Sequence, residues 1–342
     1  MKKTLIMLFA ACLLLVSCTT GSPVSDESSS PAEQSEHASE SASQDVSDDV
    51  SDNVSADDSS EDESEQSTVQ VIGIDDGKFV YYAFGDSIAY GYALDYPSTM
   101  CYGALFASHF DGIQYENYAV SGHKTSDMLN VLDSVDVSDA DLITISIGAN
   151  NLLGYAIEAT NGVLETYGDG IFNDYVSALM GIGDKDRVVN FIKDVEYAFT
   201  NEDFQAKAQA GLDKLNEELP QIFQKIQDQN DKCVIIIQTV YNPYKGIAIG
   251  LPGEYSFDLS AACDGYIKTF NDAIISVAEE YGCEVLDVYT DFENSDSDLI
   301  NAGIVVTPSM SFNYDPHPNA AGHIEIADIL YTEWMGIIDA DE

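Results

Sequence analysis

Five short apolar runs, separated by stretches with helical spacing, are the strongest pattern along this chain. The third and fourth runs, LITISI and CVIIIQTV, are almost continuous in branched apolar residues, which is typical of parallel strands covered on both faces. The five runs cover residues 79–84, 114–120, 142–147, 233–240 and 284–288. Apolar residues recur at helical spacing over 99–110, 125–132, 203–227, 262–281 and 320–337. This alternation predicts a three-layer α/β/α sandwich around a five-stranded parallel sheet.

One interval, residues 152–230, is too long for a simple crossover between two of these strands. It contains a part punctuated by glycines and a part rich in Lys, Asp and Glu with helical spacing. We interpret it as a helical insertion in a domain that covers residues 71–342. The pattern leaves open whether this insertion forms a cap over a site or packs away from it.

The first eighteen residues are typical of an export signal. Lys2 and Lys3 precede an apolar run at residues 5–16. That run is shorter than the roughly 20 residues that a membrane-spanning helix needs. It ends in Leu-Val-Ser-Cys, which resembles a bacterial lipobox, in which Cys18 would be lipidated and become the mature N-terminus. The alternative is an ordinary signal peptide with an incidental cysteine. We predict a lipid anchor at Cys18 and a position on the extracellular face of the bacterial cell membrane.

Residues 19–70 are dominated by small, polar and acidic side chains. The segment has 15 acidic residues and contains no Lys, Arg, Phe, Tyr or Trp. It cannot bury enough apolar surface to offset its chain entropy, and its charges repel one another, so a disordered spacer is predicted. The spacer is either a stalk that lifts the domain off the membrane or a solvated tail without a role.

Charge and cysteine content narrow the possible partners of the domain. Residues 71–342 carry 45 acidic and 11 basic side chains, which disfavours nucleic acid, anionic lipid surfaces and polyanionic substrates. Neutral esters are compatible with this charge.

Four cysteines, Cys101, Cys233, Cys263 and Cys283, show no metal-ligand spacing. Cys233 and Cys283 each open a predicted strand and could lie close together, but buried free thiols are an equal alternative, so the sequence leaves the disulfide pairing open.

Polar and glycine clusters follow the first three predicted strands. They contain Ser87, Gly122 and Asn150, and the carboxyl ends of parallel strands meet at one edge of the sheet, where ligands bind. Acyl transfer needs a nucleophile, a base and donors aimed at a developing oxyanion. Ser87 supplies a hydroxyl and a backbone N–H, Gly122 an unobstructed N–H, and Asn150 a neutral amide. Each cluster alone is commonplace.

The base must come from one of the four histidines of the predicted domain. His109 lies in a predicted helix, and we interpret it as structural. His123 follows Gly122 and either lines the pocket or is exposed. His323 lies in the final predicted helix, where we expect it to pack or to cap. His317 lies in a predicted loop between two prolines, with Asp315 two residues before it. This setting suits a base whose tautomer is fixed by a carboxylate, so Asp315 would accept from one ring nitrogen while the other receives the Ser87 proton.

These residues together resemble the four ordered blocks of the GDSL/SGNH hydrolases. Ser87 lies in GDS, Gly122 in the N-x-x-x-x-G element, Asn150 in the block usually written G-x-N-D, and His317 in HPNAAGH. The resemblance covers about residues 78–335. It implies a flavodoxin-like sandwich, a Ser-His-Asp triad with a Ser/Gly/Asn oxyanion hole, and ester hydrolysis with neither a metal nor an organic cofactor.

Two positions depart from that pattern. Asn151 stands where the family usually has Asp, and Tyr314 stands three residues before His317, where the family acid commonly lies. We favour Asp315 as the acid. A backbone carbonyl that orients His317, leaving a Ser-His dyad, is the alternative.

The sequence thus predicts a cell-surface serine esterase. Acetylated glycans or short-acyl lipids are its expected substrates, and the oligomeric state is left open. One alternative is a surface lipoprotein that binds a ligand on a degenerate hydrolase fold. Another is an acyltransferase that uses the same site.

Overall fold

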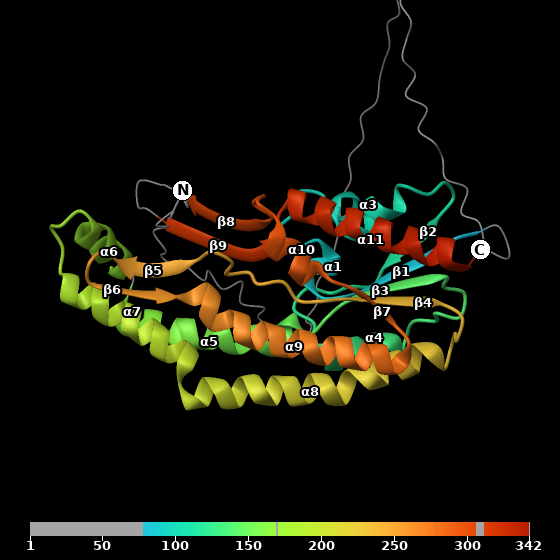
Figure 1. The fold of residues 1–342 in the computed structure, drawn as a ribbon, viewed down its shortest axis with the longest axis horizontal. Coiled ribbons are helices and arrows are strands. Elements are labelled where there is room, and N and C mark those ends of the chain that lie inside the picture. Colours follow the sequence, from blue (N-terminus) through green and yellow to red (C-terminus); the bar gives the residue numbers. More distant parts are fainter. Residues whose placement is uncertain (1–77, 169, 306–310, 342) are drawn as a thin grey trace, which may run out of the picture. The chain divides into compact units, whose positions relative to one another are not determined.

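A computed structural model of the protein describes residues 78–168, 170–305 and 311–341 (Figure 1). The predicted export signal with Cys18, the whole predicted spacer and residues 71–77 of the predicted domain lie outside the described residues. Within these ranges no helix is both long and apolar enough to cross a bilayer.

The five predicted runs form the five strands of one parallel sheet, in the order β2-β1-β3-β4-β7. This is the flavodoxin-like strand order, so the predicted fold class is confirmed. Each strand lies within its predicted run or one residue beyond it: β1 (Val80–Gly85), β2 (Gln114–Asn117), β3 (Leu142–Ser146), β4 (Val234–Gln238) and β7 (Glu284–Leu286).

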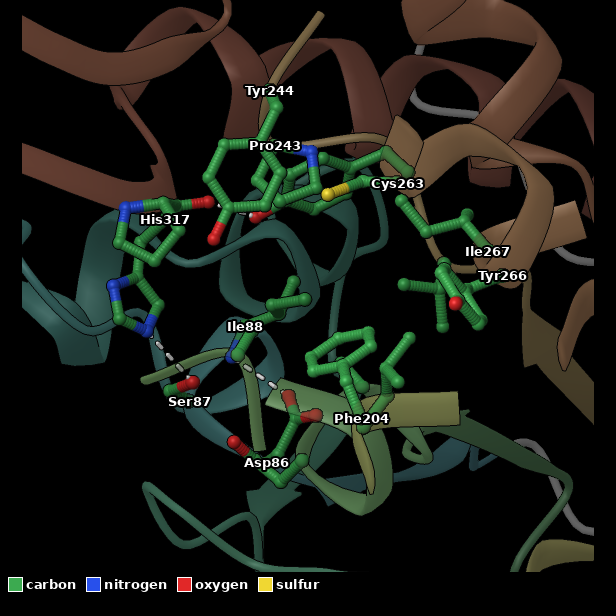
Figure 2. Close-up of a pocket in the computed structure, with 17 residues that line it drawn as sticks. Asp86, Ser87, Ile88, Phe204, Pro243, Tyr244, Cys263, Tyr266, Ile267 and His317 are labelled. Carbon is green, nitrogen blue, oxygen red and sulfur yellow. Dashed lines mark hydrogen bonds between the residues drawn. The ribbon is translucent and has the colours of Figure 1, made fainter. Parts of the chain in front are cut away.

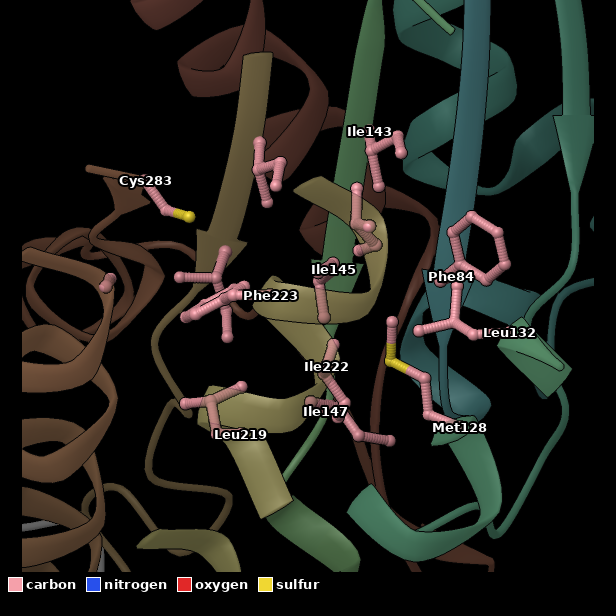
Figure 3. Packing of buried hydrophobic residues seen from close by; sticks show 14 of the residues in the cluster. Phe84, Met128, Leu132, Ile143, Ile145, Ile147, Leu219, Ile222, Phe223 and Cys283 are labelled. Atoms are coloured by element: carbon pink, nitrogen blue, oxygen red, sulfur yellow. The ribbon is translucent and has the colours of Figure 1, made fainter. Parts of the chain in front are cut away.

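Helices cover both faces of the sheet because successive side chains of its strands point to opposite sides. In β1, Val80, Tyr82 and Phe84 belong to one buried cluster, and Tyr81 and Ala83 belong to another. The first cluster includes residues of α4 (Thr125–Leu132), α8 (Glu202–Gln227) and α9 (Leu259–Tyr281), and Figure 3 shows part of it. The second includes residues of α3 (Tyr102–Ala107), α10 (Val288–Asn294) and α11 (Ala320–Asp341).

The predicted helix over residues 99–110 is a pair of short helices, α2 (Pro97–Met100) and α3. Cys101 separates them because its backbone is extended, with its buried thiol 3.4 Å from the Tyr115 hydroxyl. His109 therefore follows α3 rather than lying in a helix, and its ring packs 4.8 Å from that of Tyr331.

His323 is buried in α11, where it caps α3. Its Nδ1 accepts a hydrogen bond from the Tyr102 N–H at the start of that helix, over 3.2 Å. Burial lowers the pKa of His323 to about 4, so the ring is neutral at physiological pH. The predicted packing or capping position of His323 agrees with this contact.

The helices between β3 and β4 divide into two groups. The second half of α8 is the crossover helix, since its Leu215, Leu219 and Phe223 pack in the sheet core. The first half of α8, with Phe204, packs in a third cluster that is separate from the two sheet faces. That cluster also contains residues of α5 (Ala149–Tyr167), α6 (Ile171–Leu179) and α7 (Lys185–Thr200).

Two antiparallel hairpins escaped sequence-based prediction. One joins β5 (Ala248–Leu251) to β6 (Tyr255–Asp258), and the other joins β8 (Ile300–Val305) to β9 (Ser311–Pro318). Residues 315–317, expected in a loop, belong to β9. Two prolines suggest a loop along the chain, but the pairs Ile300–Pro318 and Ala302–Tyr314 on either side of this segment keep it within the strand.

All four cysteines of the domain are free thiols. Cys233 and Cys283 do share the first core cluster, as their positions at strand starts suggested. Burial raises the pKa of Cys233 to about 11 and that of Cys283 to about 12.

Candidate active site

Ser87 is presented by a tight turn between β1 and the short helix α1 (Ser87–Tyr90). Gly85 in this turn has a φ of +139°, and a Cβ there would lie 2.1 Å from the Ser146 carbonyl oxygen, so only glycine fits. The Asp86 carboxylate caps α1 by accepting from the Ile88 N–H over 2.9 Å. The turn thereby fixes Ser87 at the carboxyl end of a central strand.

His317 lies against Ser87 although 230 residues separate them. The His317 Nε2 and the Ser87 Oγ are 2.9 Å apart, and the His317 Nδ1 lies 2.5 Å from the Asp315 Oδ1 (Figure 2 shows the Ser87 contact). The His317 side chain is 16% exposed and that of Asp315 is 19% exposed, which shields the pair from water. A carboxylate on Nδ1 favours the tautomer whose Nε2 is free to accept the serine proton.

A bulge in β9 explains how an acid only two residues before His317 can reach its ring. Ile300 pairs with Pro318 and Ala302 pairs with Tyr314, so three residues of β9 face the single residue Asn301. Asp315 also accepts from the His317 backbone N–H over 3.1 Å, and the Tyr241 hydroxyl donates to the Pro316 carbonyl over 2.6 Å. The bulge therefore places a carboxylate, rather than a backbone carbonyl, against Nδ1.

Tyr92 is a site residue that sequence reasoning missed. Its ring centroid lies 4.5 Å from that of His317, and its backbone N–H donates to the Ser87 carbonyl over 2.9 Å. The next residue, Ala93, has a φ of +68°, a strained conformation for a residue with a Cβ. No motif marks Tyr92 in the sequence, because its contact with His317 exists only in the folded chain.

Gly122 and Asn150, two of the predicted oxyanion donors, are connected through the loop that follows β2. Asn150, near the start of α5, donates from Nδ2 to the His123 carbonyl over 3.0 Å, next to Gly122. Gly122 has a φ of +85°, and a Cβ there would meet nothing within 4 Å. This left-handed backbone conformation favours glycine at position 122. Asn150 lines the same cavity as Ser87, and Gly122 is not among the lining residues.

Asn151, which replaces the usual family Asp, holds the start of α4. Its Oδ1 accepts from the Thr125 N–H over 3.2 Å, and its Nδ2 donates to the Thr125 Oγ1 over 2.9 Å. The Thr125 hydroxyl in turn donates to the Glu218 carboxylate over 2.5 Å. Because that hydroxyl already gives its proton to Glu218, position 151 needs a donor as well as an acceptor. An amide meets this need and a carboxylate does not.

We therefore expect Asn151→Asp to lower the free energy of unfolding by about 2–3 kcal/mol, because it loses one donor and brings a second carboxylate near Glu218. Urea denaturation at pH 7 measures this change. Adding Glu218→Gln, which removes the opposing charge, should recover part of the loss. An Asn151→Asp protein as stable as the wild type would contradict this account of the site.

Asp86 is a fully buried carboxyl beside the nucleophile. Its Oδ2 has no hydrogen-bond partner, and the residue is 0% exposed. Burial raises the pKa of Asp86 to about 7, although the hydrogen bond from Ile88 and the nearby His317 act in the opposite direction. Near neutral pH this carboxyl is therefore close to half protonated.

Asp86 should make stability depend on pH. In the unfolded chain an Asp has a pKa near 3.9, so between about pH 4 and pH 7 the native state holds a proton that the unfolded state releases. The free energy of unfolding then falls as pH rises through this window. Asp86→Asn cannot ionise at this position. As the pH rises from 5 to 8, its free energy of unfolding should therefore increase by about 2–4 kcal/mol relative to that of the wild type.

Urea denaturation of both proteins at pH 5 and pH 8 tests this expectation. Asp111→Asn, the same change at an exposed position, controls for the general effect of removing one negative charge. A wild-type minus variant difference that does not change with pH would show that the Asp86 carboxyl is not held protonated.

A cavity that opens to solvent adjoins the Ser87 hydroxyl, and the empty space inside it and at its open mouth together amounts to about 690 Å³. Asp86, Ser87, Asn150 and His317 line one part of it. Figure 2 shows Phe204, Tyr266 and Ile267 on the side away from Ser87 and His317. Leu152 and Ala156 of α5 and Phe204 of α8 also line the cavity, so helices of the 152–230 interval form part of its wall. Among the described residues, no group of three or more His, Cys, Asp or Glu side chains is arranged to hold a metal ion.

Comparisons with known proteins agree with this arrangement at the level of family. A model of the GDSL-like Lipase/Acylhydrolase family matches residues 83–323. Among solved structures, an extracellular lipase from Streptomyces rimosus is 20% identical with a TM-score of 0.47, covering 74% of this chain and 99% of that one. Phospholipase A1 from Streptomyces albidoflavus NA297 is 17% identical with a TM-score of 0.47, covering 74% and 98%. No curated protein sequence matches the chain.

The family match includes Ser87, Gly122, Asn150 and His317, and it spans well over half of the chain. The sheet order and the residues at its carboxyl edge are those expected from the sequence motifs. This protein belongs to the GDSL-like lipase/acylhydrolase family, and its membership implies an ester hydrolase.

Proposed function

We propose that the protein is a serine esterase in which Ser87 is the nucleophile, His317 the general base and Asp315 the residue that orients the base. The observation that carries this proposal is the continuous relay from Ser87 Oγ to His317 Nε2 and from His317 Nδ1 to Asp315, which opens onto a cavity. A base within hydrogen-bonding reach of the nucleophile is the first geometric requirement of such catalysis.

In the proposed reaction the Ser87 oxygen attacks the ester carbonyl while His317 takes the hydroxyl proton. The carbonyl oxygen becomes an oxyanion, for which the Ser87 and Gly122 N–H groups and the Asn150 amide are the proposed donors. When the tetrahedral intermediate collapses, the ester C–O bond breaks and His317 gives its proton to the departing alcohol. His317 then takes a proton from a water molecule, which attacks the carbonyl carbon of the acyl-enzyme. As the bond between this carbon and the Ser87 oxygen breaks, His317 gives the proton to Ser87 and the acid is released.

The two departures that made a non-catalytic lipoprotein an alternative have physical explanations that support an active enzyme. The β9 bulge brings Asp315 to the ring without an acid at position 314. The hydrogen bonds of Asn151 to Thr125 make an amide the better residue there. Neither departure removes a group that the proposed reaction uses.

A fluorophosphonate probe tests the proposal directly, because it reacts only with a serine whose hydroxyl is activated. We expect covalent labelling at Ser87, mapped by mass spectrometry, and no labelling after His317→Ala. A wild-type protein that takes up no probe and hydrolyses 4-nitrophenyl acetate no faster than Ser87→Ala would overturn the proposal. Product analysis with added alcohols or sugars separates a hydrolase, which yields free acid, from an acyltransferase.

We also propose that Cys18 carries a lipid anchor that holds the enzyme on the extracellular face of the cell membrane, with residues 19–70 as a stalk. The charged start, the apolar run and the Leu-Val-Ser-Cys ending support this proposal. In a bacterial expression host, metabolic labelling with a fatty acid should mark the wild-type chain and not Cys18→Ala. Equal labelling of both would rule out an anchor at Cys18.

A further inference from the structure

The cavity beside Ser87 is chemically divided. Its ionisable acid and base, its serine hydroxyl and its amide belong to Asp86, His317, Ser87 and Asn150, which lie at the carboxyl edge of the sheet or against it. The other polar groups of its lining are the thiol of Cys263 and the hydroxyls of Tyr241, Tyr244 and Tyr266. Away from them the wall is formed by apolar side chains, including Leu152, Phe204 and Ile267. Figure 2 shows this division, with Ser87 and His317 on one side and Phe204, Tyr266 and Ile267 on the other.

The apolar part of the cavity offers nothing to a charged group. No Lys or Arg lines it. Burial raises the pKa of its one thiol, Cys263, to about 12, so this side chain also stays neutral. Charge without a partner is unfavourable in such surroundings, whereas hydrocarbon is favoured there.

Three helices contribute the apolar residues of this wall. Leu152 and Ala156 come from α5, Phe204 from the first half of α8, and Ile267 from the first half of α9. Phe204 also lines a second cavity, between α5, α7 and α8. Its ring is therefore a partition between the two spaces.

The position of His317 decides which part of the ester would enter. The leaving alcohol takes its proton from His317, so it lies on the His317 side of the ester carbonyl. The acyl group, which stays attached to Ser87, then extends the opposite way, toward Phe204 and Ile267.

We infer that the cavity is an acyl-chain site that selects uncharged acyl groups longer than acetyl, with Phe204 and Ile267 setting the chain-length limit. This inference deepens the proposed esterase function and depends on it. It moves the expected substrates away from acetylated glycans and toward esters of medium-chain fatty acids.

The test is a series of 4-nitrophenyl esters from acetyl to dodecanoyl. Burial of each added methylene should raise kcat/KM about fourfold, so hexanoyl should exceed acetyl by on the order of 100-fold before the rise levels off. Wild-type activity that is highest on acetyl, or equal at all lengths, would overturn the inference while leaving the esterase proposal intact. Turnover that does not depend on Ser87 would instead overturn the esterase proposal.

Two variants separate a chain-length effect from general damage. Ile267→Trp should fill the cavity, lowering kcat/KM on octanoyl at least 30-fold while changing that on acetyl less than threefold. Ile324→Trp, the same change at a 51% exposed position on α11, is the matched control and should leave the whole profile unchanged.

Phe204→Ala removes the partition and should move the optimum to longer chains by two or more carbons. This variant keeps the inference falsifiable if Ile267→Trp fails to fold, as judged by circular dichroism. Equal losses at every chain length in Ile267→Trp, together with an unshifted optimum in Phe204→Ala, would show that the cavity does not hold the acyl group.

Discussion

Replacing Ser87 with alanine is expected to lower kcat on 4-nitrophenyl esters by about 10⁴- to 10⁶-fold. The change removes the only atom of the proposed relay that becomes covalently bound to the acyl group. KM should change little, because the apolar wall of the cavity remains. Steady-state kinetics on an acetyl and a hexanoyl ester measures both parameters.

The Ser87→Ala prediction has an internal check in His317→Ala. Residues that act as one unit lose activity non-additively, so the double variant should be about as slow as either single variant. Losses that multiply, or a Ser87→Ala enzyme with more than about one hundredth of wild-type kcat, would mean that Ser87 and His317 do not act together.

Asp315→Asn should lower kcat by about 10³- to 10⁴-fold, the second largest effect. The Asn amide can turn its NH₂ toward His317 Nδ1, which stabilises the tautomer that has a proton on Nε2. That nitrogen could then no longer accept the Ser87 proton. The measurement is kcat on the best ester of the series, with circular dichroism to show that the fold is intact.

Asp315→Ala makes the interpretation sharper. It removes the orienting carboxylate without imposing the wrong tautomer, so its loss should be smaller than that of Asp315→Asn. Asp111→Asn, at an exposed position, should behave as the wild type. If both Asp315 variants stay within tenfold of the wild type, a Ser-His dyad oriented by another group is the correct description.

Most of the sheet could be predicted because its signal is local. Residues 142–147 and 233–240 are apolar over a strand's length, and the helices that cover them show their own spacing over residues 203–227 and 262–281. The small hairpins were missed for the opposite reason. β8 and β9 are strands because they pair with each other, and this pairing leaves no local pattern in the sequence. The two prolines in β9 are more typical of a loop.

The candidate site was predicted in part. The turns that hold Ser87 and Asn150 follow apolar strands directly, and the two prolines beside His317 made it the most constrained histidine. Tyr92 was missed, because the packing of its ring against that of His317 leaves no mark in the local sequence. The function of Asn151 was also hidden, since its partner Thr125 is fixed by Glu218, 93 residues further along the chain.

The sequence by itself determined which segments become buried strands, in what order polar turns follow them, and which serine and histidine are candidates for chemistry. These properties depend on neighbours along the chain, where side-chain spacing and backbone preference act directly. Only the tertiary structure decided that Asp315 lies on His317 Nδ1, that the Asp86 carboxyl is fully buried, and that Phe204 and Ile267 line one cavity. Each of these depends on the packing of elements far apart in sequence, which sets distance, burial and desolvation.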